Sequence, residues 1–212
     1  MTTPAVGSIE FFFDVGSPYS YLAAELIGGV AERTGVPVRW RPFLLGAVFK
    51  ASGNEMPARI PAKARWMLED LRAWARLYEV PFRMASRFPL NTLRTQRGLC
   101  AAALSAGEGA VPAYALALFQ AYWVDDRDVS SDAELAVLAD AAGLDGAAIV
   151  AAIDAPATKD ALRANTDDAV ARGAFGAPTC FYDGAMFWGH DRLPLLEAAI
   201  VGDAPVRARL GR

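Results

Sequence analysis

The chain has 212 residues, of which 54% are hydrophobic and 21% are charged, and its formal net charge is −3. This length and composition suit one well-cored domain, or one domain with a large insertion, and they exclude a disordered chain. The near-neutral balance gives no reason to expect nucleic acid as a partner, so an anionic ligand must be held by local cations.

Two cysteines, Cys100 and Cys180, lie far apart in the sequence and form no C-x-x-C pair. This spacing argues against a disulfide framework or a metal site and favours buried free thiols. The segment from Met1 to Gly16 has no basic start and no long apolar run, and charged residues interrupt the other apolar stretches. We therefore expect no signal peptide, no membrane partner and a reducing, cytoplasmic location.

The first part of the chain predicts a β-α-β unit. Ile9–Val15 is aromatic and β-prone, which is typical of a buried strand. Gly16-Ser17-Pro18 ends this strand, and Tyr19–Thr34 follows as a helix with Gly35 at its C-terminal end. Val36–Phe43 predicts a second strand, which should run parallel to the first.

The middle of the chain is predicted to be helical. Its helices are rich in Ala, Leu and Trp, and Gly, Pro or Asp residues separate them. The predicted helices are Ala62–Tyr78, Thr92–Ala106, Ala113–Val124, Asp132–Ala142 and Lys159–Arg172.

Two short β-prone runs, Thr179–Tyr182 and Ala185–Trp188, flank Asp183-Gly184, which is a strong hairpin signal. Leu193–Ile200 predicts a final helix. Without the helical block, the order is β-α-β-α-β-β-α, as in a thioredoxin-like domain. The predicted fold class is therefore α/β. Residues 1–45 and 155–212 form a thioredoxin-like domain, and a large all-helical insertion, residues 46–154, follows the second strand.

Ser17 lies where the first strand ends and the first helix begins. The N–H groups and the dipole at a helix N-terminus favour an anion, so a thiolate placed there would be stabilised. The Ser17 hydroxyl can donate a charge-assisted hydrogen bond to it, or Ser17 can simply cap the helix. Ser17-Pro18-Tyr19-Ser20 also has the spacing of a C-x-x-C motif with both cysteines replaced. Since thiol exchange needs a thiolate, this motif indicates a thiol cofactor.

Gly176-Ala177-Pro178-Thr179 precedes the hairpin. A proline at this place in a thioredoxin-like domain is commonly cis, which we predict here, with an ordinary trans proline as the alternative. A cis bond leaves the backbone of Ala177 free to pair with a peptide-like ligand.

The segment after the hairpin offers further polar groups. Asp191 fits either a helix N-cap or an acceptor for the amino group of a γ-glutamyl moiety. His190, the only histidine, can be neutral or charged near pH 7. A structural role is the commoner one for a lone histidine beside a capping aspartate.

Two side chains near the start of the insertion can hold polar parts of a ligand. Asn54 can donate and accept hydrogen bonds, and Lys63 offers a point charge for a carboxylate. A surface role is the alternative for each. The aromatic residues Trp66, Trp74 and Tyr78 have helical spacing that predicts core, although part of this stripe can line an aromatic-substrate pocket.

Six short motifs, in a specific order along the chain, carry a family resemblance. The motifs are Phe13–Leu22, Gly53-Asn54, Arg72–Ala75, Phe88–Thr92, Phe175–Thr179 and Phe187–Leu193. Together they resemble the 2-hydroxychromene-2-carboxylate isomerase family, which belongs to the broader group of kappa-class glutathione transferases and DsbA-like proteins. The resemblance covers nearly the whole chain and depends on the set of motifs rather than on any one of them.

The resemblance implies that glutathione is the cofactor, with its sulfur held by Ser17 and its cysteinyl part paired to the backbone of Ala177, next to Pro178. The residues implied to receive the γ-glutamyl end are Trp188, Gly189, His190 and Asp191. Those implied to face the substrate or the glycyl carboxylate are Arg39, Lys50, Gly53, Asn54 and Lys63. A homodimer is also implied. His190 departs from the family pattern, in which isomerases have Asn and kappa transferases Ser, so the subgroup stays open.

The implied activity is the glutathione-dependent isomerisation of a small carboxylate from aromatic catabolism, such as naphthalene degradation. The reaction type is 2-hydroxychromene-2-carboxylate to trans-o-hydroxybenzylidenepyruvate, by reversible addition of the thiolate. Two alternatives remain open. One is a kappa-like glutathione transferase that releases the conjugate, and the other is a non-catalytic DsbA-like protein that binds thiols or peptides.

Overall fold

The computed structural model describes residues 7–202. At its centre is a four-stranded mixed sheet with the strand order β2-β1-β3-β4. The strands are β1 (Ile9–Phe13), β2 (Val38–Pro42), β3 (Thr179–Tyr182) and β4 (Ala185–Trp188). β1 pairs parallel with β2 and antiparallel with β3, and β3 pairs antiparallel with β4. The predicted thioredoxin-like topology is therefore confirmed.

Helices make up most of the remaining structure. They are α1 (Pro18–Thr34), α2 (Leu45–Ser52), α3 (Pro61–Leu77), α4 (Leu93–Ala106), α5 (Val111–Trp123), α6 (Asp132–Ala141), α7 (Gly146–Ala152), α8 (Pro156–Ala171) and α9 (Leu193–Ile200). Three short 3-10 helices are η1 (Pro57–Arg59), η2 (Glu108–Ala110) and η3 (His190–Arg192). Within residues 7–202, none of the helices has the length and apolar character needed to cross a membrane.

Two helices, α2 and α7, are missing from the sequence-based prediction. They have only 8 and 7 residues. Helices this short are not stable on their own and form because they pack against the rest of the protein. Their sequence patterns were therefore too weak to reveal them.

β1 is buried on both faces because helices cover both sides of the sheet. Phe11 and Phe13 belong to the large core cluster that includes residues of α1 and α5, whereas Phe12 packs with Phe181 in a second cluster beside α8. Glu10 is only 4% exposed on this central strand. Its carboxylate pairs with Arg41 and Arg172, each at 2.7 Å, so the buried charge is compensated.

The helical insertion shares the hydrophobic core of the thioredoxin-like part. The Phe13 and Phe119 ring centroids are 5.7 Å apart. On α4, the fully buried Gln96 donates to the carbonyls of Phe13 and Phe43, at 2.8 and 2.9 Å, and accepts from the N–H of Val15. One hydrophobic cluster therefore extends across the predicted boundary between residues 1–45 and 46–154. The residues on the two sides of this boundary share one core.

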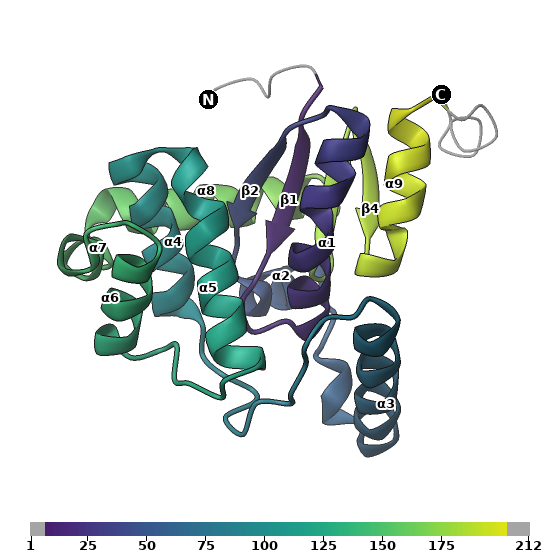
Figure 1. Cartoon of the computed structure of the whole chain (residues 1–212), viewed down its shortest axis with the longest axis horizontal. Coiled ribbons are helices and arrows are strands. Elements are labelled where there is room, and N and C mark those ends of the chain that lie inside the picture. Colours follow the sequence, from purple (N-terminus) through teal and green to yellow (C-terminus); the bar gives the residue numbers. More distant parts are fainter. Residues whose placement is uncertain (1–6, 203–212) are drawn as a thin grey trace.

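α3 lies apart from the other inserted helices. Figure 1 shows α4, α5, α6 and α7 gathered beside β2, while α3 lies below the N-terminal end of α1. The Tyr19 hydroxyl on α1 donates to Asp70 on α3 at 2.8 Å. α3 therefore flanks the end of the sheet at which β1 stops.

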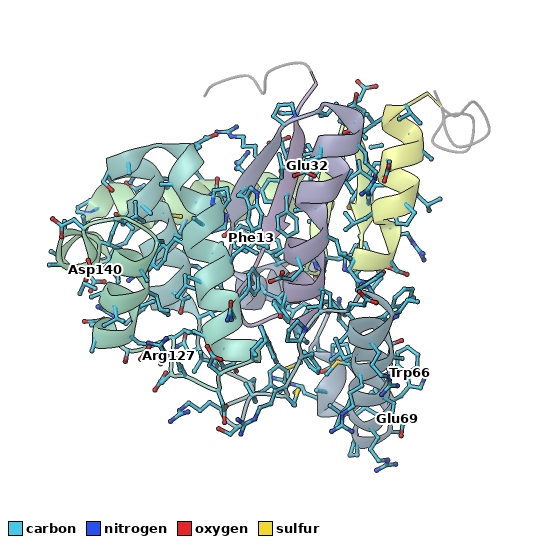
Figure 2. All side chains as sticks on the ribbon, viewed as in Figure 1. Phe13, Glu32, Trp66, Glu69, Arg127 and Asp140 are labelled. Atoms are coloured by element: carbon cyan, nitrogen blue, oxygen red, sulfur yellow. The ribbon has the colours of Figure 1, made fainter. Side chains whose placement is uncertain are left out.

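The predicted aromatic stripe on α3 is only partly core. Trp74 and Tyr78 are half-buried, but Trp66 is 62% exposed, and Figure 2 shows it on the outer side of the helix. The prediction of a core position for Trp66 was wrong, because the face of α3 that carries it has no neighbouring element to pack against in the described part of the chain.

We predict that Gln96→Leu lowers the free energy of unfolding by at least about 2 kcal/mol, because each buried group left without its partner costs about 1–3 kcal/mol. The groups left unpaired would be the carbonyl of Phe43 and the N–H of Val15, whereas the carbonyl of Phe13 keeps the hydrogen bond from the N–H of Phe43. Urea unfolding measures the change. Gln120→Leu, at an exposed position on α5, is the matched control and should change stability by less than about 0.5 kcal/mol. Equal stabilities for the two variants would show that Gln96 does not hold the ends of β1 and β2.

Candidate active site

Ser17 caps α1 and also reaches the loop before β3. Its Oγ accepts a hydrogen bond from the N–H of Ser20 at 3.2 Å, and Pro18 occupies the first turn of the helix. The same hydroxyl donates to the carbonyl of Ala177 at 3.3 Å. Ser17 therefore caps α1, and its hydroxyl hydrogen points at the carbonyl of Ala177, the residue whose backbone is expected to face a ligand. Ser17 is only 4% exposed, so its geometry is well constrained.

The Ala177–Pro178 bond is cis, as the sequence predicts, and Phe88–Pro89 is a second cis bond. The N–H of Gly189 donates to the carbonyl of Pro178 at 3.0 Å. The loop before β3 therefore contacts both Ser17 and the segment that follows β4.

A buried carboxylate, that of Asp14, ties this end of the sheet together. Asp14 Oδ1 accepts from the N–H of Gly16 at 2.9 Å and from the hydroxyl of Thr92 at 2.7 Å, and Oδ2 accepts from the N–H of Leu45 at 2.9 Å. Burial raises the pKa of Asp14 above its usual range, although the three hydrogen bonds act against the shift. Sequence reasoning did not single out Asp14, although an acidic residue at the end of an apolar strand is an available signal.

The indole of Trp188 and the backbone of Gly189 lie beside the loop before β3. The Trp188 ring lies 4.7 Å from that of Phe175 and covers Gly176, where an added Cβ would meet the indole Nε1. Gly189 has a φ of +107°, a conformation that favours glycine. Gly176 is therefore required by the close approach of the indole, and Gly189 by its backbone conformation and by the Asp191 carboxylate, which an added Cβ would meet.

Asp191 does not cap α9. The helix begins at Leu193 without a side-chain cap, and Asp191 instead pairs with Arg192 at 2.9 Å. The N-cap interpretation of Asp191 was wrong because Asp191 lies inside the 3-10 helix η3, and Arg192 occupies the N-cap position of α9. Its carboxylate remains partly exposed and next to Gly189.

The ring of His190 is enclosed by aromatic side chains. It stacks on Tyr19 at a centroid distance of 5.3 Å, meets Trp74 edge-on at 4.9 Å, and its Nδ1 lies 3.3 Å from the Tyr78 hydroxyl. Burial lowers the pKa of His190, and the nearby carboxylates of Asp191 and Asp70 only partly oppose this shift. The ring is therefore neutral at pH 7 and joins η3 to α1 and α3. Any contact with a γ-glutamyl group would have to use its backbone.

Asn54 lies beside the loop before β3. Its Nδ2 donates to the carbonyl of Phe175 at 2.9 Å, two residues before Ala177. Gly53 ends α2 with a φ of +70°, which turns the chain toward this contact. Lys50 is exposed in the last turn of α2 and Lys63 is exposed in the first turn of α3. The two lysines flank Asn54 along the chain.

The structure does not bring Arg39 to Ser17. Arg39 pairs in register with Glu10 near the start of β2, whereas Ser17 follows the end of β1. Because the two strands are parallel, at least about 10 Å of strand separates them. Arg39 instead forms an ion pair with Glu108, with its Nε 2.8 Å from a carboxylate oxygen. Sequence alone cannot show which end of a strand faces a site when the strand's register is unknown.

The cysteines supply no thiolate. Cys100 and Cys180 are free and buried, as the sequence predicts, and burial raises the pKa of each thiol to about 12. Neither ionises near neutral pH, so thiol chemistry at Ser17 needs a thiol from another molecule.

The chain is similar to known proteins over nearly its whole length. A model of the DSBA-like thioredoxin domain matches residues 8–201. A 2-hydroxychromene-2-carboxylate isomerase of Sphingobium xenophagum is 34% identical over 199 residues, which cover 92% of this chain and 98% of that protein. Glutathione S-transferase kappa 1 of Rattus norvegicus is 30% identical and covers 94% of this chain and 93% of its own. A solved structure of a 2-hydroxychromene-2-carboxylate isomerase superposes with a TM-score of 0.83 at 29% identity, over 95% of this chain and 98% of that one.

The burial of the neutral His190 ring predicts how the stability of the protein depends on pH. Its pKa in the folded protein is lowered from the ordinary value of 6.5, so the unfolded chain binds the proton more readily. Stability should therefore be retained above about pH 6.5 and lost as the pH falls below it, by up to about 1.4 kcal/mol per pH unit. Urea unfolding between pH 7.5 and 5.5 measures this slope.

His190→Phe should flatten the slope in that range, because this variant has no histidine to titrate. Tyr78→Phe is the matched control. It removes the hydroxyl near Nδ1 but keeps the imidazole, so it should keep the slope. An unchanged slope in His190→Phe would contradict the assignment of a buried, neutral ring.

Proposed function

Because the chain belongs to the DsbA-like thioredoxin family, we propose that it is a glutathione-dependent isomerase that converts 2-hydroxychromene-2-carboxylate to trans-o-hydroxybenzylidenepyruvate. The observation that carries the proposal is the Ser17 hydroxyl, held at the N-terminus of α1 against Ala177, in a chain whose own thiols are buried. The similarity to proteins named 2-hydroxychromene-2-carboxylate isomerase supports the choice of reaction.

In this proposal the Ser17 hydroxyl changes its acceptor when glutathione binds. It donates to the neutral carbonyl of Ala177 in the present structure. A thiolate beside the first turn of α1 is a stronger acceptor and gains from the helix dipole, so the hydroxyl would turn toward it. The carbonyl of Ala177 is then released to pair with the backbone of the cysteinyl part, in the manner of a short β-strand.

The two ends of glutathione would lie on either side of this point. The γ-glutamyl end would meet Trp188 and Gly189, with the Asp191 carboxylate near its amino group. The glycyl carboxylate would meet Asn54 and Lys63. The positively charged amino group would face the Asp191 carboxylate, and the negatively charged glycyl carboxylate would face Lys63. These two pairs of opposite charges give the ligand one orientation.

The substrate carboxylate would be held near Gly53 and Asn54, with Lys50 as its cation. Arg39 is left out of this site because Glu108 pairs with it at the far end of β2. The cyclic hemiketal first opens: the ring C–O bond breaks, the proton of the 2-hydroxyl group passes to the ring oxygen to give a phenol, and the 2-carbon becomes a ketone. The thiolate then adds to the double bond conjugated to this ketone, and the electron pair moves to the ketone oxygen as an enolate. The former double bond rotates as a single bond. The enolate then reforms the double bond and expels the thiolate, so glutathione is regenerated.

A kappa-like glutathione transferase is the second candidate, and the similarity to the kappa-class transferase of rat favours it. The difference is that a transferase releases the conjugate, whereas the isomerase returns its thiol. A non-catalytic thiol-binding protein would do neither. A cytoplasmic location would keep glutathione reduced, and a homodimer is the assembly that the family resemblance suggests.

We expect that isomerisation of 2-hydroxychromene-2-carboxylate needs glutathione but does not consume it. The absorbance of the acid is followed with glutathione at a small fraction of the substrate concentration, and the remaining thiol is titrated at the end. Many turnovers per glutathione support the isomerase. Loss of one thiol per substrate converted indicates the transferase, and full activity without any thiol contradicts the cofactor assignment.

Ser17→Ala should raise the apparent pKa of bound glutathione and lower kcat about 10²-fold or more, by analogy with the loss of one donor to a developing anion. Ultraviolet absorbance of the thiolate against pH measures the pKa. Because the substitution also removes a helix cap, which costs about 1 kcal/mol, its unfolding is measured in parallel. Ser20→Ala is the matched control, since its buried hydroxyl makes no hydrogen bond in the described structure. The same thiol pKa in wild type and Ser17→Ala would refute the role of Ser17.

A further inference from the structure

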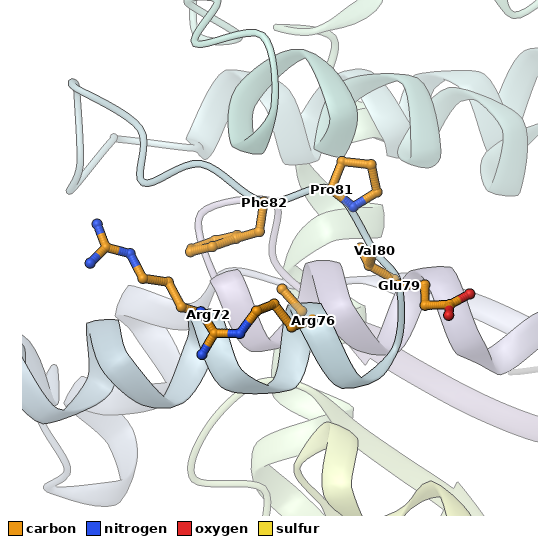
Figure 3. A pocket seen from close by; sticks show the side chains of 7 residues that line it. Arg72, Arg76, Glu79, Val80, Pro81 and Phe82 are labelled. Carbon is orange, nitrogen blue, oxygen red and sulfur yellow. The ribbon is translucent and has the colours of Figure 1, made fainter.

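A solvent-open pocket of about 450 Å³ lies between α3 and the chain segment that follows it. Figure 3 shows the segment from Glu79 to Phe82 crossing above the helix, with two arginine side chains on the side of α3 that faces it. The residues that line the pocket are Arg72, Ala75, Arg76, Glu79, Val80, Pro81 and Phe82. This volume falls in the range of sites for small organic ligands.

The two arginines of the pocket have no counter-ion. Within residues 7–202, the cations that make no ion pair are Lys50, Lys63, Arg65, Arg72 and Arg76, and all lie on α2 or α3. Every other described arginine is paired with a carboxylate. Figure 3 shows the Glu79 carboxylate pointing away from both guanidinium groups. Positive charge is therefore uncompensated in a protein whose net charge is −3.

The opposite wall of the pocket is apolar and held in place. The Phe82 ring stacks on the buried Trp123, with centroids 6.0 Å apart and planes 24° apart. The Tyr21 hydroxyl donates to the carbonyl of Pro81 at 2.6 Å, which fixes the segment to α1. A flat apolar ligand body would therefore meet a wall that is already formed.

We propose that this pocket binds small organic acids that have a flat, apolar body, with the carboxylate held by Arg72 and Arg76. Guanidinium groups suit carboxylates because their parallel N–H donors match the two oxygens. Arg72 and Arg76 are one helical turn apart and share a flank of α3, whereas Trp74 and Tyr78 lie on the flank that meets His190. The pocket is thus distinct from the site proposed at Ser17 and does not depend on the function proposed there.

Binding of benzoate tests this proposal, followed by NMR chemical-shift changes of the backbone amides and by calorimetry. Wild-type protein should bind benzoate, with the largest shifts in α3 and residues 79–82. The double variant Arg72→Gln/Arg76→Gln should bind it about tenfold more weakly or worse, since both charge-assisted contacts are lost. Benzamide, which has the same ring but no charge, should bind to the wild-type protein as weakly as benzoate binds to the double variant.

Two control variants separate this pocket from other anion sites. Arg65→Gln removes an unpaired cation of the same helix that does not line the pocket, and it should leave benzoate affinity within about twofold. Lys63→Gln removes a cation proposed for the Ser17 site and should also leave it unchanged. An unchanged affinity in the double variant, equal binding of benzamide, or loss of benzoate binding in Lys63→Gln alone would each overturn the proposal. Glutathione binding in the double variant, measured separately, reports on the Ser17 site.

Discussion

The buried carboxylate of Asp14 joins three parts of the chain that are distant in sequence. It accepts hydrogen bonds from the turn before Ser17, from the start of α2 and from Thr92 at the start of α4. A carboxylate can serve three donors at once because it has only acceptor sites, whereas an amide would turn its NH₂ group toward one of them. Burial without a cation raises its pKa, so these donors are what makes the charged form tolerable.

Gln96 extends this arrangement one layer deeper. Its amide hydrogen-bonds to the backbone of Phe13, Phe43 and Val15, where β1 and β2 end, and the Phe13 carbonyl also accepts from the N–H of Phe43. Together, Asp14 and Gln96 connect the inserted helices to the end of the sheet at which Ser17 lies. The helical insertion is therefore part of the support for the candidate site as well as a cover over it.

The charge around the candidate site differs from the charge on the rest of the surface. Carboxylates neutralise the arginines elsewhere in the described chain, and the uncompensated cations are confined to α2 and α3. His190 adds no charge at neutral pH because aromatic rings enclose it. The described cations that make no ion pair therefore lie on the two helices beside the candidate site, even though the whole protein is slightly acidic.

Sequence by itself determined the β-α-β unit, the hairpin, the longer helices and the placement of Ser17 at a helix N-terminus, because strand periodicity and helix boundaries are local properties. It also predicted that any thiol acting at Ser17 comes from another molecule, since neither cysteine lies in the Ser17 motif. Only the tertiary structure showed that Asp14 and Gln96 support the site, that Arg39 pairs with Glu108 away from it, and that His190 is enclosed by Tyr19, Trp74 and Tyr78. These features depend on contacts between residues from 31 to 171 positions apart, such as Asp14 with Leu45 and Tyr19 with His190. Strand register and helix packing decide these contacts, and no local pattern in the sequence encodes them.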